Sequence, residues 1–172
     1  MACYLVVRWD AHLIGISNNP LRSRGVIAIS PPMGDRGWNE YADTLESLNR
    51  DAPTGTVRCV LLQSIAHDVD MPSAVLRRRL GAIRAKIPAS VINVVVTESR
   101  VIRAMQTALD WLQRPVYDSS THADITSAIA HVERVLGWPD PDLWRYWQEA
   151  HADLAAKARA ATRAAHDATS LR

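Results

Sequence analysis

The stretch Val91-Ile92-Asn93-Val94-Val95-Val96 decides the fold, because it is apolar except at Asn93 and rich in β-branched residues. Successive side chains of a strand point to opposite faces of a sheet, so an apolar run without alternation indicates a strand covered on both faces. The run from Val57 to Gln63 has the same character apart from Arg58. We therefore predict two buried strands at the centre of a sheet.

Helical patterns lie between and after these strands. Apolar residues recur every three or four positions in four segments, which predicts four amphipathic helices. Their apolar stripes are Trp38, Tyr41, Leu45 and Leu48; Leu76, Leu80, Ile83 and Ile87; Ile102, Met105, Leu109 and Leu112; and Ile125, Ile129, Val132 and Leu136. Further strands are expected at Cys3–Trp9, Val26–Ser30 and 115–117, with a short one at His12–Ile16.

The order is therefore strand, strand, three helix–strand repeats and a closing helix. A helical crossover returns the chain to the end of the sheet where the preceding strand began, so the strands that it joins are parallel. The chain is thus predicted to be α/β, with a mixed, mostly parallel sheet whose first strand pair could be antiparallel.

Capping residues mark several helix ends. Pro72 suits the first turn of the second helix, with Asp70 as a candidate cap, and Ser99 can cap the third. Thr121 has capping-box spacing before the fourth helix, and Gly137 stops that helix.

Composition excludes several classes of protein. The 172 residues suit one globular domain with an appendage, and a net charge of +2 gives no overall attraction to nucleic acid or membranes. No apolar run approaches the roughly 20 residues of a membrane span, and the first residues do not resemble a signal peptide. Cys3 and Cys59 lie in apolar runs, which favours buried thiols. We expect a cytoplasmic protein without membrane insertion or bound nucleic acid.

The last 35 residues form an extension. Pro139-Asp140-Pro141 divides a domain at 1–137 from a helical extension at 138–172, with a helix expected from about 141 to near 168. Its first half, to Leu154, should dock on the domain or on a second copy, and its Ala-rich second half should project. This segment contains three tryptophans, which either pack this helix against the domain or bind a partner: Trp138, Trp144 and Trp147.

Two short stretches carry a resemblance to a known family. They are Val94-Val95-Val96-Thr97-Glu98-Ser99-Arg100-Val101-Ile102-Arg103, and Val116-Tyr117-Asp118 followed by a polar link and the segment 123–136. With the order of elements over about residues 1 to 137, they resemble the STAS domain of bacterial anti-sigma factor antagonists, the SpoIIAA-like group. The resemblance implies a mixed sheet with helices mainly on one face, and a regulatory role through binding a protein such as a kinase-type or anti-sigma regulator.

The resemblance also implies a phosphorylation site. In that family a partner kinase modifies a Ser or Thr in an Asp-Ser-Ser/Thr-Gly loop at a helix start. The matching place here is Met71-Pro72-Ser73-Ala74, where Ser73 is the only hydroxyl, the Gly is absent and Pro72 replaces a hydroxyl residue. Ser73 is therefore either a phosphorylation switch or a hydrogen-bonding residue of the first helical turn.

Arginines follow Ser73 on the same predicted helix. Arg77, Arg78 and Arg84 could bind an acidic partner, or form a solvated face partly paired with Asp68 and Asp70. Because 18 of the 20 basic residues are Arg, a cluster of them carries little weight by itself.

No catalytic constellation is recognised. The segment His67-Asp68-Val69-Asp70 lacks the further ligands of a metal site, and Ser64, His67 and Asp68 are close only in sequence. We therefore expect neither a catalytic residue nor a metal or cofactor.

The function predicted from sequence is a regulatory protein-binding module of the STAS type, and homodimer formation stays open. One alternative is a SEC14-like lipid or hydrophobic-ligand binding protein, which needs a sizeable apolar cavity between helices and sheet. Because the helical stripes match the width of a packed core, that alternative ranks second. A further alternative is a scaffold that self-assembles through the C-terminal helix.

Overall fold

A computed structural model describes residues 4–10, 21–30, 34–51, 58–66 and 69–170. Its strands are β1 (Tyr4–Asp10), β2 (Leu21–Ser30), β3 (Arg58–Ile65), β4 (Val91–Val96) and β5 (Asp118–His122). Its helices are α1 (Gly34–Asp51), α2 (Ala74–Arg84), α3 (Arg100–Gln113), α4 (Ile125–Leu136) and α5 (Pro141–Ser170).

The five strands form one sheet in the order β1-β2-β3-β4-β5. β1 runs antiparallel to β2, with Val7 opposite Ile27, and every later pair is parallel. Helices α1, α2 and α3 are the crossovers between successive parallel strands. Crossovers are right-handed, so a sheet that grows in one direction carries its successive crossover helices on one face.

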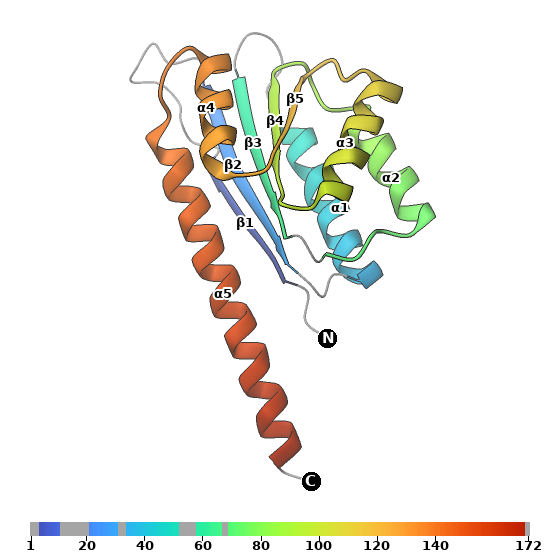
Figure 1. The fold of residues 1–172 in the computed structure, drawn as a ribbon, viewed down its shortest axis with the longest axis vertical. Helices are drawn as coiled ribbons and strands as arrows, with labels where there is room; N and C mark the ends of the chain where they lie inside the picture. The colour runs from blue at the N-terminus through green and yellow to red at the C-terminus, as the bar shows by residue number, and fades with distance from the viewer. Residues whose placement is uncertain (1–3, 11–20, 31–33, 52–57, 67–68, 171–172) are drawn as a thin grey trace.

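Helices cover both faces of this sheet (Figure 1). Buried side chains of α1, α2 and α3 form one core with Ile27, Leu61 and Val95. Buried side chains of α4 and α5 form a second core with Ala28, Leu62 and Val94. The predicted α/β class and the mostly parallel mixed sheet are confirmed. Three of the four helices that precede the extension lie on one face, as predicted, while α4 and the extension cover the second face.

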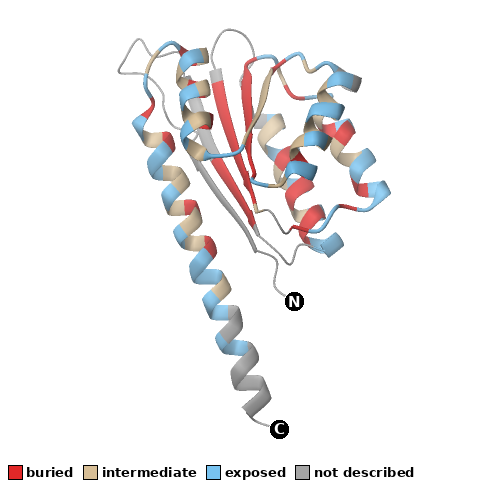
Figure 2. Ribbon diagram, in the orientation of Figure 1, coloured by how far each residue is buried: buried red, intermediate tan, exposed pale blue. Residues whose placement is uncertain are grey.

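The central strands are buried on both sides, as their composition predicts. All six residues of β4 are buried, and so are Cys59 to Ile65 of β3. Complete burial of one aliphatic side chain contributes roughly 1.5–3 kcal/mol to stability. These two strands therefore tie the two cores to a single sheet (Figure 2).

Two helix starts and one strand differ from the predictions. α2 begins at Ala74, after Pro72, and its cap is Ser73 and not Asp70, because the Ser73 hydroxyl accepts a hydrogen bond from the Leu76 amide at 3.4 Å. β5 covers 118–122 instead of 115–117, so Thr121 lies in a strand and Asp124 caps α4. The polar sequence Asp118-Ser119-Ser120-Thr121-His122 pairs as an edge strand, where complete burial is not required.

Other predicted caps are confirmed. The Ser99 hydroxyl accepts from the Ile102 amide at 3.3 Å, and Gly137 ends α4 with a φ of 84°, which suits glycine. The predicted strand at His12–Ile16 lies outside the described residues.

The C-terminal helix confirms the predicted helical extension. α5 packs against β1 and β2, and Leu143, Ala150 and Leu154 are buried in the second core. Trp138 and Trp147 are partly buried against the same core. Most described side chains from Ala155 to Ala164 are exposed, and Figure 2 shows this half of the helix extending beyond the sheet. The first half of α5 is therefore part of the folded core.

We predict unequal effects of shortening and weakening α5. Removing residues 155–172 should lower the free energy of unfolding by less than about 1 kcal/mol, because little apolar area is lost. Leu143→Ala should lower it by roughly 2–5 kcal/mol, because Leu143 is completely buried. Urea denaturation of the two variants measures both values. A truncation as damaging as Leu143→Ala would show that the end of the helix is structurally essential.

Candidate functional site

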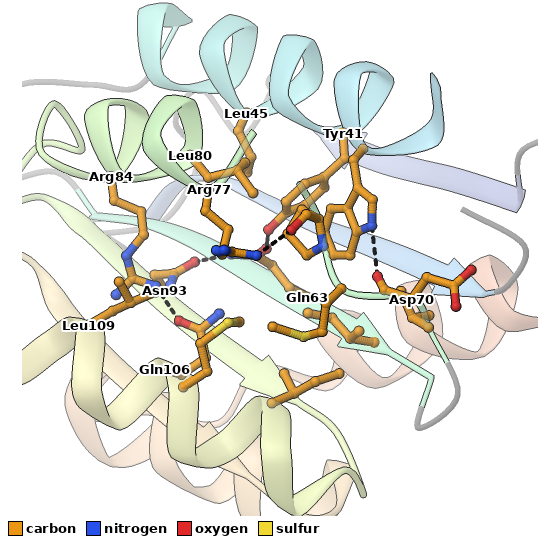
Figure 3. A pocket seen from close by; sticks show the side chains of 18 of the residues that line it. Tyr41, Leu45, Gln63, Asp70, Arg77, Leu80, Arg84, Asn93, Gln106 and Leu109 are labelled. Atoms are coloured by element: carbon orange, nitrogen blue, oxygen red, sulfur yellow. Dashed lines mark hydrogen bonds between the residues drawn. The ribbon is translucent and has the colours of Figure 1, made fainter. Parts of the chain in front are cut away.

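An apolar cavity lies between the sheet and helices α1, α2 and α3 (Figure 3). Its volume is about 100 Å³. Most of its wall is aliphatic, sulfur-containing or aromatic: Trp38, Tyr41, Leu45, Ile65, Val69, Met71, Leu80, Ile87, Ile102, Met105 and Leu109. The amphipathic stripes that were expected to fill a core thus enclose a cavity as well.

The cavity has a polar floor made by two amides of the sheet. Gln63 of β3 and Asn93 of β4 replace apolar residues on the face toward α1–α3, and they are only 4% and 1% exposed. Asn93 pairs with Leu61 and Gln63 with Val95, so the two amides are diagonal neighbours. The Gln63 Nε2 atom donates a hydrogen bond to Asn93 Oδ1 at 2.5 Å.

Tyr41 of α1 completes this polar row. Its hydroxyl donates a hydrogen bond to Gln63 Oε1. Burial raises the pKa of Tyr41 well above its ordinary value of 10.0, although the positive charge of Arg84 opposes this effect. The hydroxyl therefore keeps its proton at neutral pH. Hydrogen bonding runs from Tyr41 to Gln63 to Asn93.

The Asn93 Nδ2 atom ends this row. The Oδ1 atom of Asn93 accepts the hydrogen bond from Gln63. Among the described residues, none accepts a hydrogen bond from Nδ2. Since Asn93 lines the cavity, the floor presents an unpaired donor to whatever occupies the cavity.

Arg84 closes one end of the cavity. Its guanidinium donates hydrogen bonds to Gln106 and Asp110 of α3, and Asp110 also accepts from the Ser119 hydroxyl of β5 at 3.2 Å. The side chain is 12% exposed. Arg84 was predicted to bind a partner, but the structure turns it inward, where it fixes α2 against α3.

The start of α2 forms the rim. Arg77 lines the cavity and donates to the Pro72 carbonyl at 2.7 Å, while the Trp38 indole donates to the Asp70 carbonyl at 2.8 Å. Ser73 and Arg78 are exposed beside them. The predicted residues Ser73, Arg77 and Arg78 are therefore all exposed at the start of α2, and of the three Arg77 lines the cavity.

A second, more open groove of about 510 Å³ lies along α1 and α2. Its residues are mostly polar, and Arg79 there donates to Asp43 at 2.6 Å and to Glu46 at 3.0 Å. Exposed ion pairs of this kind contribute little energy. The apolar cavity, which is more enclosed and has a buried amide floor, is the candidate site.

The aromatic residues of α5 lie on the other face of the sheet. Trp144 stacks on Trp147 with ring centroids 5.4 Å apart, and Trp147 contacts the His151 ring at 4.3 Å. His151 Nε2 lies 2.8 Å from the Ser64 hydroxyl of β3. Trp147 is only half-buried and Trp144 is 39% exposed, so pinning of α5 and a partner contact both remain compatible with their positions.

Histidine and acidic side chains lie close together at β5 and α4. His131 Nε2 lies 2.8 Å from Asp118, and its ring is 5.3 Å from that of His122. Within the described residues, no group of three or more His, Cys, Asp or Glu side chains is arranged to hold a metal ion. Residues 67 and 68 lie outside the described part of the chain, so their arrangement with Ser64 stays undescribed.

Comparison of the chain with protein-family models, curated proteins and solved structures finds no match. The described helices include none with the length and apolar character needed to cross a membrane. The resemblance to the STAS domain stays a prediction, and the function is argued from the residues of the chain itself.

Sequence reasoning missed the cavity floor. Gln63 and Asn93 were the signal, because each interrupts or ends a run of residues that a strand buried on both faces requires to be apolar. A buried amide costs free energy unless it is hydrogen-bonded, so such an interruption indicates a polar network or a ligand. Tyr41, in contrast, was read only as part of an apolar stripe.

We predict that two histidines make the protein less stable in mild acid. Burial lowers the pKa of His151 below its ordinary value of 6.5, and burial together with the charge of His131 lowers that of His122. Below pH 6.5 the unfolded chain therefore binds more protons at these residues than the folded protein does.

Their contribution to the free energy of unfolding should fall as the pH decreases through 6.5 toward the lower folded-state pKa values. Urea denaturation between about pH 7.5 and about pH 5.5 measures this change. His151→Gln should make the decline shallower. An unchanged decline in that variant would mean that His151 does not contribute.

Proposed function

We propose that this chain is a binding module that holds a small, largely apolar ligand in the cavity between α1, α2, α3 and the sheet. The single observation that carries this proposal is an apolar cavity with a buried amide floor. Ligand sites are typically apolar hollows with a few convergent polar groups, and this cavity has that composition.

The size of the cavity limits the ligand. Its volume of about 100 Å³ is too small for a lipid chain. An apolar cavity of roughly 150 Å³ holds benzene. Because this cavity is smaller than that, we propose a ligand no larger than a single six-membered ring, which enters when the Met71 and Met105 side chains move, instead of the lipid that a SEC14-like protein would carry.

The rim offers a way in. Met71 and Met105 both line the cavity, and Met71 is 46% exposed beside the start of α2. Methionine side chains are unbranched and adapt readily to different neighbours. Rotation of these side chains would admit a ligand without moving the sheet.

We predict that filling the cavity abolishes ligand binding. Toluene is a suitable probe, and its binding can be followed by NMR shifts of the backbone amides that line the cavity. Leu80→Phe should weaken toluene binding by roughly tenfold or more, because the larger ring occupies the space.

Leu48→Phe is the matched control. Leu48 and Leu80 are both partly buried against the same core, but only Leu80 lines the cavity. The control should bind toluene as the wild type does. Absence of toluene binding to the wild type, or equal binding by all three proteins, would contradict the proposed function.

A second candidate function is the regulatory protein-binding module that the STAS resemblance implies, acting in the cytoplasm. The observation that favours it is the exposed surface of Ser73, Arg77 and Arg78. Ser73 caps α2, and a helix start stabilises a phosphate through its free amides and dipole. A phosphate there would also lie within reach of positively charged side chains.

We predict that a negative charge at Ser73 changes partner binding without unfolding the protein. Aspartate is as good a helix cap as serine, so Ser73→Asp should keep α2 intact. Affinity capture from an extract of the producing cells, quantified by mass spectrometry, should recover a specific partner with the wild type and at least roughly tenfold less with Ser73→Asp.

Ser99→Asp provides the control, because Ser99 caps the neighbouring helix in the same way. That variant should recover the partner as the wild type does. Equal recovery with Ser73→Asp and wild type would reject the switch. Self-assembly through the second half of α5 stays a prediction from the sequence.

A further inference from the structure

We infer that the ligand of the cavity is a small neutral molecule with a carbonyl group, whose oxygen accepts a hydrogen bond from Asn93 Nδ2. This inference rests on the proposed function and adds the chemical class of the ligand. Two observations carry it: the unpaired amide donor on the cavity floor, and the charge balance around the cavity.

The donor is the first observation. Asn93 is only 1% exposed, and its Oδ1 atom accepts a hydrogen bond from Gln63 Nε2 at 2.5 Å. A buried donor without an acceptor is costly, so such groups in folded proteins are paired with protein, water or ligand. Within the described residues no protein acceptor pairs with Nδ2. An acceptor on the ligand would therefore replace water at this atom.

The directions of the hydrogen bonds in the Tyr41–Gln63–Asn93 row indicate that the ligand accepts a hydrogen bond. Tyr41 keeps its proton and donates to Gln63 Oε1, which leaves the Gln63 amide nitrogen to donate to Asn93 Oδ1. Each amide oxygen in the row thus accepts one hydrogen bond, whereas Asn93 Nδ2 donates none to the described residues. Asn93 Nδ2 is the polar atom of the row that has no partner among the described residues, so a ligand with an acceptor complements it.

The charge balance disfavours a carboxylate beside Asn93. Arg84 is the cation at the inner end of the cavity, and its guanidinium is paired with Asp110 and bonded to Gln106. Burial of a further negative charge beside a neutralised arginine has a large desolvation cost. Arg77 also lines the cavity, but its side chain is exposed, so water screens its charge.

The apolar walls of the cavity determine the size and character of the rest of the ligand. Leu45, Leu80, Ile102 and Leu109 surround the floor with aliphatic carbon. A ring or short branched chain fills such a space, and a volume of about 100 Å³ leaves little room beyond it. Small cyclic or branched ketones, aldehydes and esters have this combination of features.

The test uses two probes, cyclohexanone and methylcyclohexane, which have similar shape but differ in the carbonyl oxygen. Both are titrated by NMR into the wild type and into Asn93→Leu, which keeps the volume of the side chain and removes the amide. Asn93→Leu should weaken cyclohexanone binding by roughly three- to tenfold, the value of one neutral hydrogen bond. It should leave methylcyclohexane binding unchanged or tighter.

A measurement on the wild type avoids reliance on a variant that could fold poorly. Infrared spectroscopy of bound carbonyl-labelled cyclohexanone should show a stretching frequency below that in an alkane solvent, because hydrogen bonding weakens the C=O bond. An unshifted carbonyl, or equal effects of Asn93→Leu on both probes, would overturn the inferred ligand class while leaving the cavity as a ligand site. Failure of both probes and of toluene to bind the wild type would overturn the proposed function as well.

Discussion

Burial of β3 and β4 on both faces is the constraint on which the structure depends. A strand with two buried faces needs a layer of helices on each side, and the chain supplies α1–α3 for one face and α4–α5 for the other. The first half of α5 is therefore required by the sheet. It covers β1 and β2 where no crossover helix reaches the second face.

Against this background, Gln63 and Asn93 stand out. Aliphatic side chains have the lowest desolvation cost at two such positions. A buried amide has to replace the hydrogen bonds that it made with water in the unfolded chain. Tyr41 and the two amides form two hydrogen bonds with one another, which leave Asn93 Nδ2 without a partner among the described residues. Arg84, bonded to Gln106 and Asp110, holds α2 and α3 in a fixed relation above them. The cavity is thus bounded by directional bonds as well as by apolar packing.

Most of the fold could be predicted from sequence, because it follows from local periodicity and from the handedness of crossovers. The apolar stripes placed α1 to α4, and the two apolar runs placed β3 and β4. β5 was displaced by several residues, since an edge strand of Asp, Ser, Thr and His has no apolar signature. The place where α5 docks was left open, because the sequence of α5 does not reveal which surface its apolar stripe contacts.

The candidate site was less predictable. Ser73, Arg77 and Arg78 are close in sequence, and their shared exposure follows from one helix start. The cavity joins residues from α1, β3, α2, β4 and α3, and its volume depends on how well side chains from separate helices fill the space between them. No periodicity carries that information. The His151–Ser64 contact, across 87 positions of sequence, could not be anticipated for the same reason.

The strand order has a consequence for how the protein forms. Every strand pairs with the strand that precedes it in the chain, so the sheet can grow one unit at a time as synthesis proceeds from the N-terminus. Helix α5 is the exception, because it returns from the β5 edge to β1 and β2 at the opposite edge. The part of the second face formed by β1 and β2 therefore stays open to water until α5 has been made, and covering it is the last long-range step of folding.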